Sequence, residues 1–113
     1  MTRVYFDEQE LELQVEGHAE SGPAGADLIC AGCSVLWLTL EEALCGSKEQ
    51  AERMWPTIHR DDGSRLVYCC PATDAEDECR MILRTIATGY RALAESFPEY
   101  VTFERGRGVS SDP

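Results

Sequence analysis

A histidine, a glycine-rich loop and a cysteine follow one another in the first third of the chain. His18 precedes a loop of glycine and proline at residues 20–26, and Cys30 comes next, where an apolar helical pattern begins. Only the thiolate form of cysteine is a good nucleophile, and the free N–H groups and positive dipole of a helix's first turn stabilise an anion. A nearby imidazole can take the thiol proton. The segment therefore predicts nucleophilic catalysis by Cys30 with His18 as the base.

Two polar residues flank Cys30 at helical spacing. Asp27 stands at an N-cap position, so the helix is expected to begin at Leu28 and to hold Cys30 in its first turn. Ser34 lies one turn later on the same face and leans back toward Cys30, where it can orient the thiol or donate to an oxyanion. A carboxylate near a thiolate disfavours it, whereas one bonded to His18 stabilises the imidazolium. Asp27 is therefore either a helix cap or a supporting residue.

The same residues allow other interpretations. An isolated cysteine is more often a buried structural residue than a nucleophile, and His59 is a second candidate base. Cys30 and Cys33 also form a C-x-x-C pair at a helix start, which is typical of thiol-disulfide oxidoreductases. A zinc site that adds Cys69 and Cys70 is a further alternative, although neighbouring strand residues point to opposite faces.

The composition restricts the class of protein. The chain has 113 residues, 43% of them hydrophobic, which suits a single domain with one modest core. Acidic residues outnumber basic ones, 21 to 10, and the net charge of −11 argues against a direct contact with nucleic acid. Residues 1–7 do not begin a signal peptide or a membrane span, so we expect a cytoplasmic protein with no membrane contact and with reduced thiols.

The hydrophobic pattern predicts the elements that position the candidate site. Alternating apolar residues predict a hairpin over 4–15 and a second one over 57–70, with its turn at 61–64. The apolar run 28–44 predicts a helix that is covered on most sides, and a capping box at 73–76 predicts the start of a second helix. A short strand is expected at the C-terminal end of the domain, over 100–103.

This order, ββα-ββα-β, predicts an α+β fold of two layers. A mostly antiparallel sheet would carry two helices on one side. We expect one domain over residues 1–105 and a flexible tail over 106–113, where glycine, serine and charged residues predominate.

The segment from Gly17 to Ser34 resembles the motif of the ribosomal-processing cysteine proteases of bacteria, the Prp family. The matching residues are Gly17-His18-Ala19 and Gly25-x-Asp27-Leu28-Ile29-Cys30-Ala31-Gly32-x-Ser34. The resemblance implies that Cys30 is the nucleophile and His18 the base, with Asp27 and Ser34 in support. It also implies that the loop containing Gly22 and Gly25 covers the substrate. The chain departs from the usual pattern at Cys33, where the family usually has a small or aliphatic residue.

The resemblance implies a cysteine endopeptidase that acts on the N-terminal extension of large-subunit ribosomal protein twenty-seven. It would cut after an aromatic residue so that the ribosome can mature, and it would act as a homodimer without a cofactor or metal. The acidic surface would suit a basic ribosomal substrate. The alternative function is a thiol-disulfide oxidoreductase that uses Cys30 and Cys33.

Overall fold

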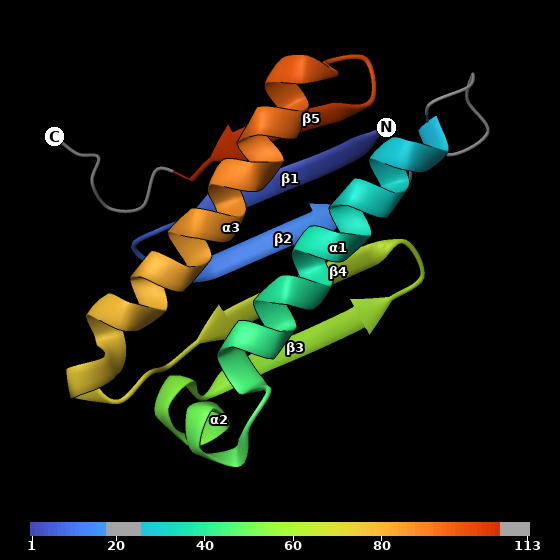
Figure 1. Ribbon diagram of the computed structural model, residues 1–113. Coiled ribbons are helices and arrows are strands. Elements are labelled where there is room, and N and C mark those ends of the chain that lie inside the picture. Colours follow the sequence, from blue (N-terminus) through green and yellow to red (C-terminus); the bar gives the residue numbers. More distant parts are fainter. Residues whose placement is uncertain (18–25, 107–113) are drawn as a thin grey trace, which may run out of the picture.

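The computed structural model describes residues 1–17 and 26–106 (Figure 1). The described elements are β1 (Thr2–Asp7), β2 (Glu12–Glu16), α1 (Ala26–Cys45), α2 (Lys48–Met54), β3 (Pro56–Asp61), β4 (Ser64–Cys69), a 3-10 turn (Thr73–Ala75), α3 (Glu76–Ser96) and β5 (Val101–Arg105).

The five strands form one sheet in the order β3-β4-β2-β1-β5. The pairs β1–β2, β2–β4 and β3–β4 are antiparallel, whereas β5 pairs with β1 in parallel. The parallel pair is possible because α3 carries the chain across the sheet before β5 begins. Helices α1 and α3 lie on the same face of the sheet (Figure 1). The expected α+β fold with a mostly antiparallel sheet is confirmed.

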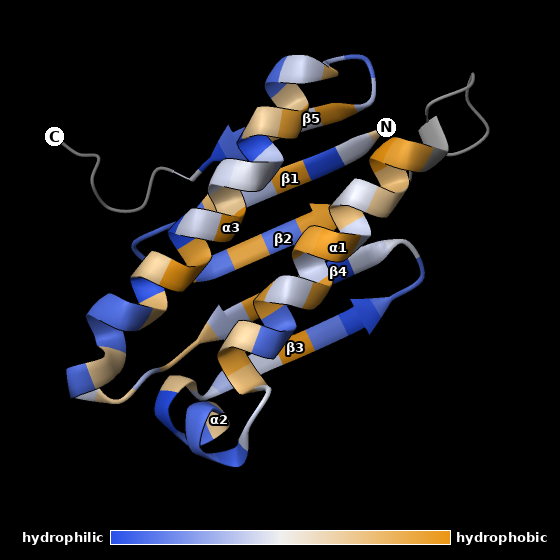
Figure 2. Ribbon diagram, viewed as in Figure 1, coloured by the Kyte–Doolittle hydropathy of each residue, from blue (hydrophilic) through white to orange (hydrophobic). Residues whose placement is uncertain are grey.

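The core lies between the sheet and the two long helices. Alternate residues of the strands face the helices because successive strand side chains point to opposite faces. Figure 2 shows apolar residues along β1 and β2 beneath α1 and α3. The largest fully buried side chains of the strands and helices are Phe6, Leu13, Val67, Trp37, Leu40, Leu44, Leu83 and Tyr90.

Helices α1 and α3 are held together by a close approach and a buried hydrogen bond. A Cβ atom on Gly89 of α3 would lie 2.7 Å from Cδ2 of Leu36, so the absence of a side chain at Gly89 lets α1 pack closely. The Tyr90 hydroxyl donates to the backbone carbonyl of Cys33 at 2.8 Å. These contacts fix the part of α1 that carries Cys33 above the sheet.

The structure corrects the number and the boundaries of the expected helices. The described residues contain three α-helices, because α2 forms where the sequence was interpreted as a polar connection. This helix has only seven residues, too few for an apolar period, but Ser47 caps it by accepting from the N–H of Gln50 at 3.0 Å. Helix α1 begins at Ala26 instead of Leu28.

The predicted capping box at residues 73–76 is wrong. Residues Thr73–Ala75 form a 3-10 turn, and α3 begins at Glu76 without a side-chain hydrogen bond to its first turn. Three acidic residues in that first turn, Glu76, Asp77 and Glu78, can stabilise the helix start instead through its dipole.

Helix α1 is also less covered than its sequence predicts. Leu28, Val35 and Leu38 are at least 60% exposed. Judged by length and composition alone, the segment Leu28–Cys45 could cross a membrane. The same helix buries Trp37, Leu40 and Leu44 in the domain core, and a core helix can be equally long and apolar.

Candidate active site

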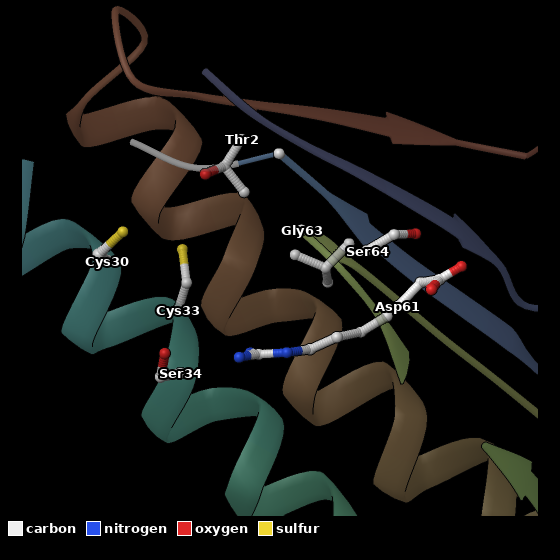
Figure 3. Close-up of a pocket in the computed structure, with 10 residues that line it drawn as sticks. Thr2, Cys30, Cys33, Ser34, Asp61, Gly63 and Ser64 are labelled. Atoms are coloured by element: carbon white, nitrogen blue, oxygen red, sulfur yellow. The ribbon is translucent and has the colours of Figure 1, made fainter. Parts of the chain in front are cut away.

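A cavity of about 110 Å³ lies between the first turns of α1 and the ends of the strands. Helix α1 lines it on one side, and the start of β1, the end of β2 and the β3–β4 turn line it on the other (Figure 3). The lining residues are Thr2, Val15, Gly17, Cys30, Cys33, Ser34, Asp61, Gly63, Ser64 and Arg65. Two of the sequence-predicted site residues, Cys30 and Ser34, are therefore brought together.

Cys30 is the fifth residue of α1 and is half-buried at the cavity. Because the helix begins at Ala26, the thiol lies two residues further inside the helix than the sequence predicts. The unpaired N–H groups of a helix are its first four, so the backbone N–H of Cys30 is not one of them. A negative charge at the cavity must then be stabilised mainly by side chains or by groups earlier in the chain.

Cys33 differs from Cys30 although both thiols line the same cavity. Its side chain is only 6% exposed. Burial raises the pKa of the Cys33 thiol to about 11, with a further contribution from the nearby Cys30, while the positive charge of Arg65 acts in the opposite direction. Cys33 is therefore a neutral thiol at physiological pH. Of the two thiols, Cys30 is the one open to a reactant in the cavity.

Arg65 is a site residue that the sequence interpretation missed. It lies on β4 opposite Val15, so it shares the helix-facing side of the sheet with Val67. Among the described residues, no carboxylate forms an ion pair with Arg65, whereas every other described arginine has such a partner. The alternation of β4 could have revealed it, because position 65 falls on the apolar side of the strand. Arg65 is a cation held next to the two thiols.

Gly17 fixes the strand end that borders the cavity. Its φ angle of 88° is one that side-chain-bearing residues rarely adopt, and a Cβ atom there would lie 2.3 Å from the carbonyl oxygen of Met1. Its N–H donates to the carbonyl of Gly63 at 2.6 Å, which ties β2 to the β3–β4 turn. This position therefore requires glycine, and His18 is the next residue in the chain.

Several predicted site residues lie outside what the structure describes. His18, Gly22 and Gly25 fall in residues 18–25, and the Asp27 side chain is not described either, although its backbone belongs to α1. Residues 107–113 of the expected tail are likewise outside the described residues. Gly106, its first residue, donates its N–H to the carbonyl of Phe6 at 2.6 Å.

The rival base His59 lies on the other face of the sheet. It is exposed on β3, and its ring lies 6.3 Å from that of Tyr68. Its neighbour Ile58 packs against the core, so His59 points away from the helices and from the cavity. His59 is therefore not the partner of Cys30 in this structure.

The six cysteines are free thiols, and they are not gathered at one place. Cys69, the last residue of β4, is buried, whereas Cys70, which follows the strand, is exposed. Over residues 1–17 and 26–106 no group of three or more histidine, cysteine, aspartate or glutamate side chains could hold a metal ion.

The α+β sheet places a half-buried cysteine in a cavity at the start of its first helix, an arrangement that suits an enzyme with a thiol nucleophile. The chain matches the model of the family described as Cysteine protease Prp over residues 1–102. It belongs to this family and is a cysteine protease.

Relatives in the same family support this assignment. The Ribosomal processing cysteine protease Prp of Staphylococcus aureus is 26% identical over 90 residues, which cover 80% of this chain and 81% of the relative. Two crystal structures of the S. aureus protease, one with a substrate peptide and one with a covalently linked product peptide, share the fold at a TM-score of 0.74. They are 24% and 23% identical, and in each case 94% of this chain matches the whole of that chain.

Proposed function

We propose that this cysteine protease removes the N-terminal extension of large-subunit ribosomal protein twenty-seven, cutting after an aromatic residue. The observation that carries the proposal is the Cys30 thiol, which is open to a cavity in a chain of the Prp family. The S. aureus relative is named a ribosomal processing protease, and its solved structures hold a substrate peptide and a covalently linked product peptide.

Cys30 is the proposed nucleophile and His18 the proposed base. His18 takes the thiol proton while the sulfur bonds to the carbonyl carbon of the scissile peptide. The carbon–nitrogen bond then breaks, and the leaving amine receives the proton from His18. Water hydrolyses the resulting thioester and restores the thiol. Gly17 lines the cavity next to Cys30 and precedes His18, which supports this pairing.

The remaining candidate residues have supporting roles in this proposal. Ser34 lines the cavity one turn after Cys30, where its hydroxyl can donate to the oxyanion or to the thiolate. Asp27 is the second residue of α1, so it is not the N-cap, and its proposed role is to orient the base. The loop with Gly22 and Gly25 covers the bound peptide. Arg65 adds a positive charge on the opposite wall of the cavity, where it can stabilise negative charge that develops during attack.

The experiment that tests this function uses a peptide copied from the extended N-terminus of the host's ribosomal protein. Mass spectrometry of the products should show one cut after an aromatic residue, and replacing that residue by alanine should abolish the cut. Cys30→Ala should abolish the cut, and Cys70→Ala is its matched control, because Cys70 is an exposed thiol outside the cavity. A peptide that stays intact with the active wild-type enzyme, or a cut that ignores the aromatic residue, would contradict the proposed substrate.

We also propose that the protein is a cytoplasmic homodimer that needs neither a cofactor nor contact with nucleic acid or membrane. The exposed residues Leu28, Val35 and Leu38 are seven and three positions apart, so they lie on one side of α1 and offer an apolar surface to a second copy. Light scattering after gel filtration should give a dimer for the wild type and a monomer for Leu38→Glu. Thr85→Glu, at an exposed threonine of α3 outside this surface, is the matched control.

A further inference from the structure

The proposed proteolytic reaction does not use Cys33, yet this residue lines the same cavity as Cys30. The other described cysteines, Cys45, Cys69, Cys70 and Cys79, do not line this cavity. Figure 3 shows the sulfur atoms of Cys30 and Cys33 directed to the same side of α1. The site of a thiol nucleophile therefore contains a second thiol within reach of the first.

The spacing of the two cysteines suits a disulfide. Residues three apart in an α-helix have Cα atoms about 5 Å apart, as the rise and radius of the helix require. Disulfides join Cα atoms that are about 4.4–6.8 Å apart. Gly32 stands between the two cysteines, and the nearest atom to a Cβ added there is a Leu93 methyl carbon at 3.8 Å. Glycine is the residue with the most permissive backbone, so Gly32 can take up the small change in backbone angles that closing the ring requires.

The two thiols also differ in access, which gives them different parts in an oxidation. Cys30 is half-buried and faces the cavity, so a small oxidant reaches it first. Cys33 is almost completely buried, so it is shielded from the oxidant but not from Cys30. The guanidinium of Arg65 lies on the opposite wall and favours a negative charge on the Cys33 sulfur.

We propose that Cys33 is a resolving thiol that captures oxidised Cys30 in an intrahelical disulfide. A hydroperoxide transfers one oxygen to the Cys30 thiolate, which becomes a sulfenic acid while the peroxide is reduced to an alcohol or to water. The Cys33 sulfur then bonds to the Cys30 sulfur, and the sulfenic oxygen leaves as water with the Cys33 proton. A dithiol reductant restores both thiols by exchange.

The consequence for activity rests on the proposed role of Cys30 as the nucleophile. In the disulfide Cys30 cannot attack a peptide, but it is protected from further oxidation to the sulfinic acid, which thiols do not reverse. The disulfide would therefore switch the protease off reversibly. Without Cys33, the same oxidant would inactivate the enzyme permanently.

The test treats the full chain with hydrogen peroxide, alkylates the remaining thiols and maps the unreduced digest by mass spectrometry. The wild type should lose two hydrogens within the peptide that contains Cys30 and Cys33, and fragmentation should place the bond between these two residues. Cys69 and Cys79 are the internal comparison, because their buried thiols lie close to each other elsewhere in the fold. A bond at that pair alone would overturn the proposal.

Peptidase activity provides the second measurement, with each variant compared with its own activity before oxidation. Dithiothreitol should restore the oxidised wild type almost fully, whereas Cys33→Ala should recover about tenfold less and carry sulfinic acid at Cys30. Cys70→Ala should behave as the wild type does. Equal recovery of the wild type and Cys33→Ala would contradict the proposal. A reduced enzyme without peptidase activity would refute the proposed function, while the disulfide map would still decide the present inference.

Discussion

Arg65 and Cys33 show how single residues set the charge in the cavity. Cys33 is a buried neutral thiol, and Arg65 is a half-buried cation that forms no ion pair with a described carboxylate, although Asp61 lines the same cavity. An unpaired guanidinium beside a reacting carbonyl can stabilise an oxyanion because the charge is already in place when the bond forms. The backbone N–H of Cys30 belongs to the helix ladder, which increases the need for such a side chain.

We therefore expect Arg65→Gln to lower kcat of the peptide cleavage by about tenfold while KM changes little. Arg65→Lys keeps the positive charge and should retain most of the activity. Steady-state kinetics of the three proteins on one peptide provide the measurement. If Arg65→Gln raises KM and leaves kcat unchanged, Arg65 binds the ground-state substrate and has no special role in the reaction.

Cys33 also gives the stability of the fold a pH dependence. In the folded protein its thiol has a pKa of about 11, against about 9.0 in the unfolded chain. Unfolding above pH 9 therefore releases a proton, so the free energy of unfolding falls as the pH rises from 9 to 11 and is unaffected below that range. Urea unfolding of Cys33→Ala should show a shallower fall over this range than the wild type. Parallel curves for the two proteins would contradict the assignment.

At the scale of the elements, the cavity depends on how the strand ends meet α1. Gly17 joins the end of β2 to the β3–β4 turn through its hydrogen bond to Gly63, while Tyr90 of α3 bonds to the Cys33 carbonyl of α1. The two contacts hold opposite walls of the cavity. A change in either wall should therefore alter the position of the thiols relative to the sheet.

Gly17→Ala tests the strand wall. We expect it to lower the free energy of unfolding by about 1–3 kcal/mol and to reduce cleavage, because alanine strains the positive φ and its Cβ meets the Met1 carbonyl. Gly32→Ala is the matched control, since its Cβ has room in α1 and alanine favours a helix. Chemical denaturation measures the free energy of unfolding of both variants, and a peptide-cleavage assay measures their activity. Equal stability of Gly17→Ala and the wild type would show that the strand end tolerates a side chain.

Local patterns in the sequence predicted much of the fold because they act over short distances. The alternation at Val4, Phe6, Leu13 and Val15 predicted the first hairpin, and the helical period after residue 76 predicted α3. Helix α2 was missed because its seven residues show no apolar period, and the early start of α1 because a plausible cap at Asp27 preceded a strong apolar run.

The candidate site was only partly predictable for a related reason. Residues 26–34 predict the helix and the thiol that it carries. The resemblance to the family motif implies that Cys30 is the nucleophile and His18 the base. Arg65 reaches the same cavity from a strand that is distant in the sequence, and only the pairing of β2 with β4 brings it there. No local pattern contains that information.

At the scale of the whole molecule, the dominant feature is the net charge of −11. A strongly acidic surface attracts basic peptides and repels nucleic acid over distances comparable to the Debye length, about 10 Å at 0.1 M salt. The charge therefore favours a basic substrate segment without determining which bond is cut.

We expect kcat/KM for a peptide with a lysine-rich segment after the cleavage site to fall by about three- to tenfold as salt rises from 0.05 to 0.5 M. A peptide with the same cleavage residues and neutral replacements for the lysines should show little change. The same salt dependence for both peptides would argue that the acidic surface serves solubility alone.

The most direct test of the account is covalent capture of the nucleophile. A peptide chloromethyl ketone built on the sequence before the cleavage site should label the reduced protein once, and mass spectrometry of the digest should place the label on Cys30. The His18→Ala variant should be labelled much more slowly, because the base no longer activates the thiol. A label on Cys33 or Cys70 with Cys30 unmodified would contradict the account.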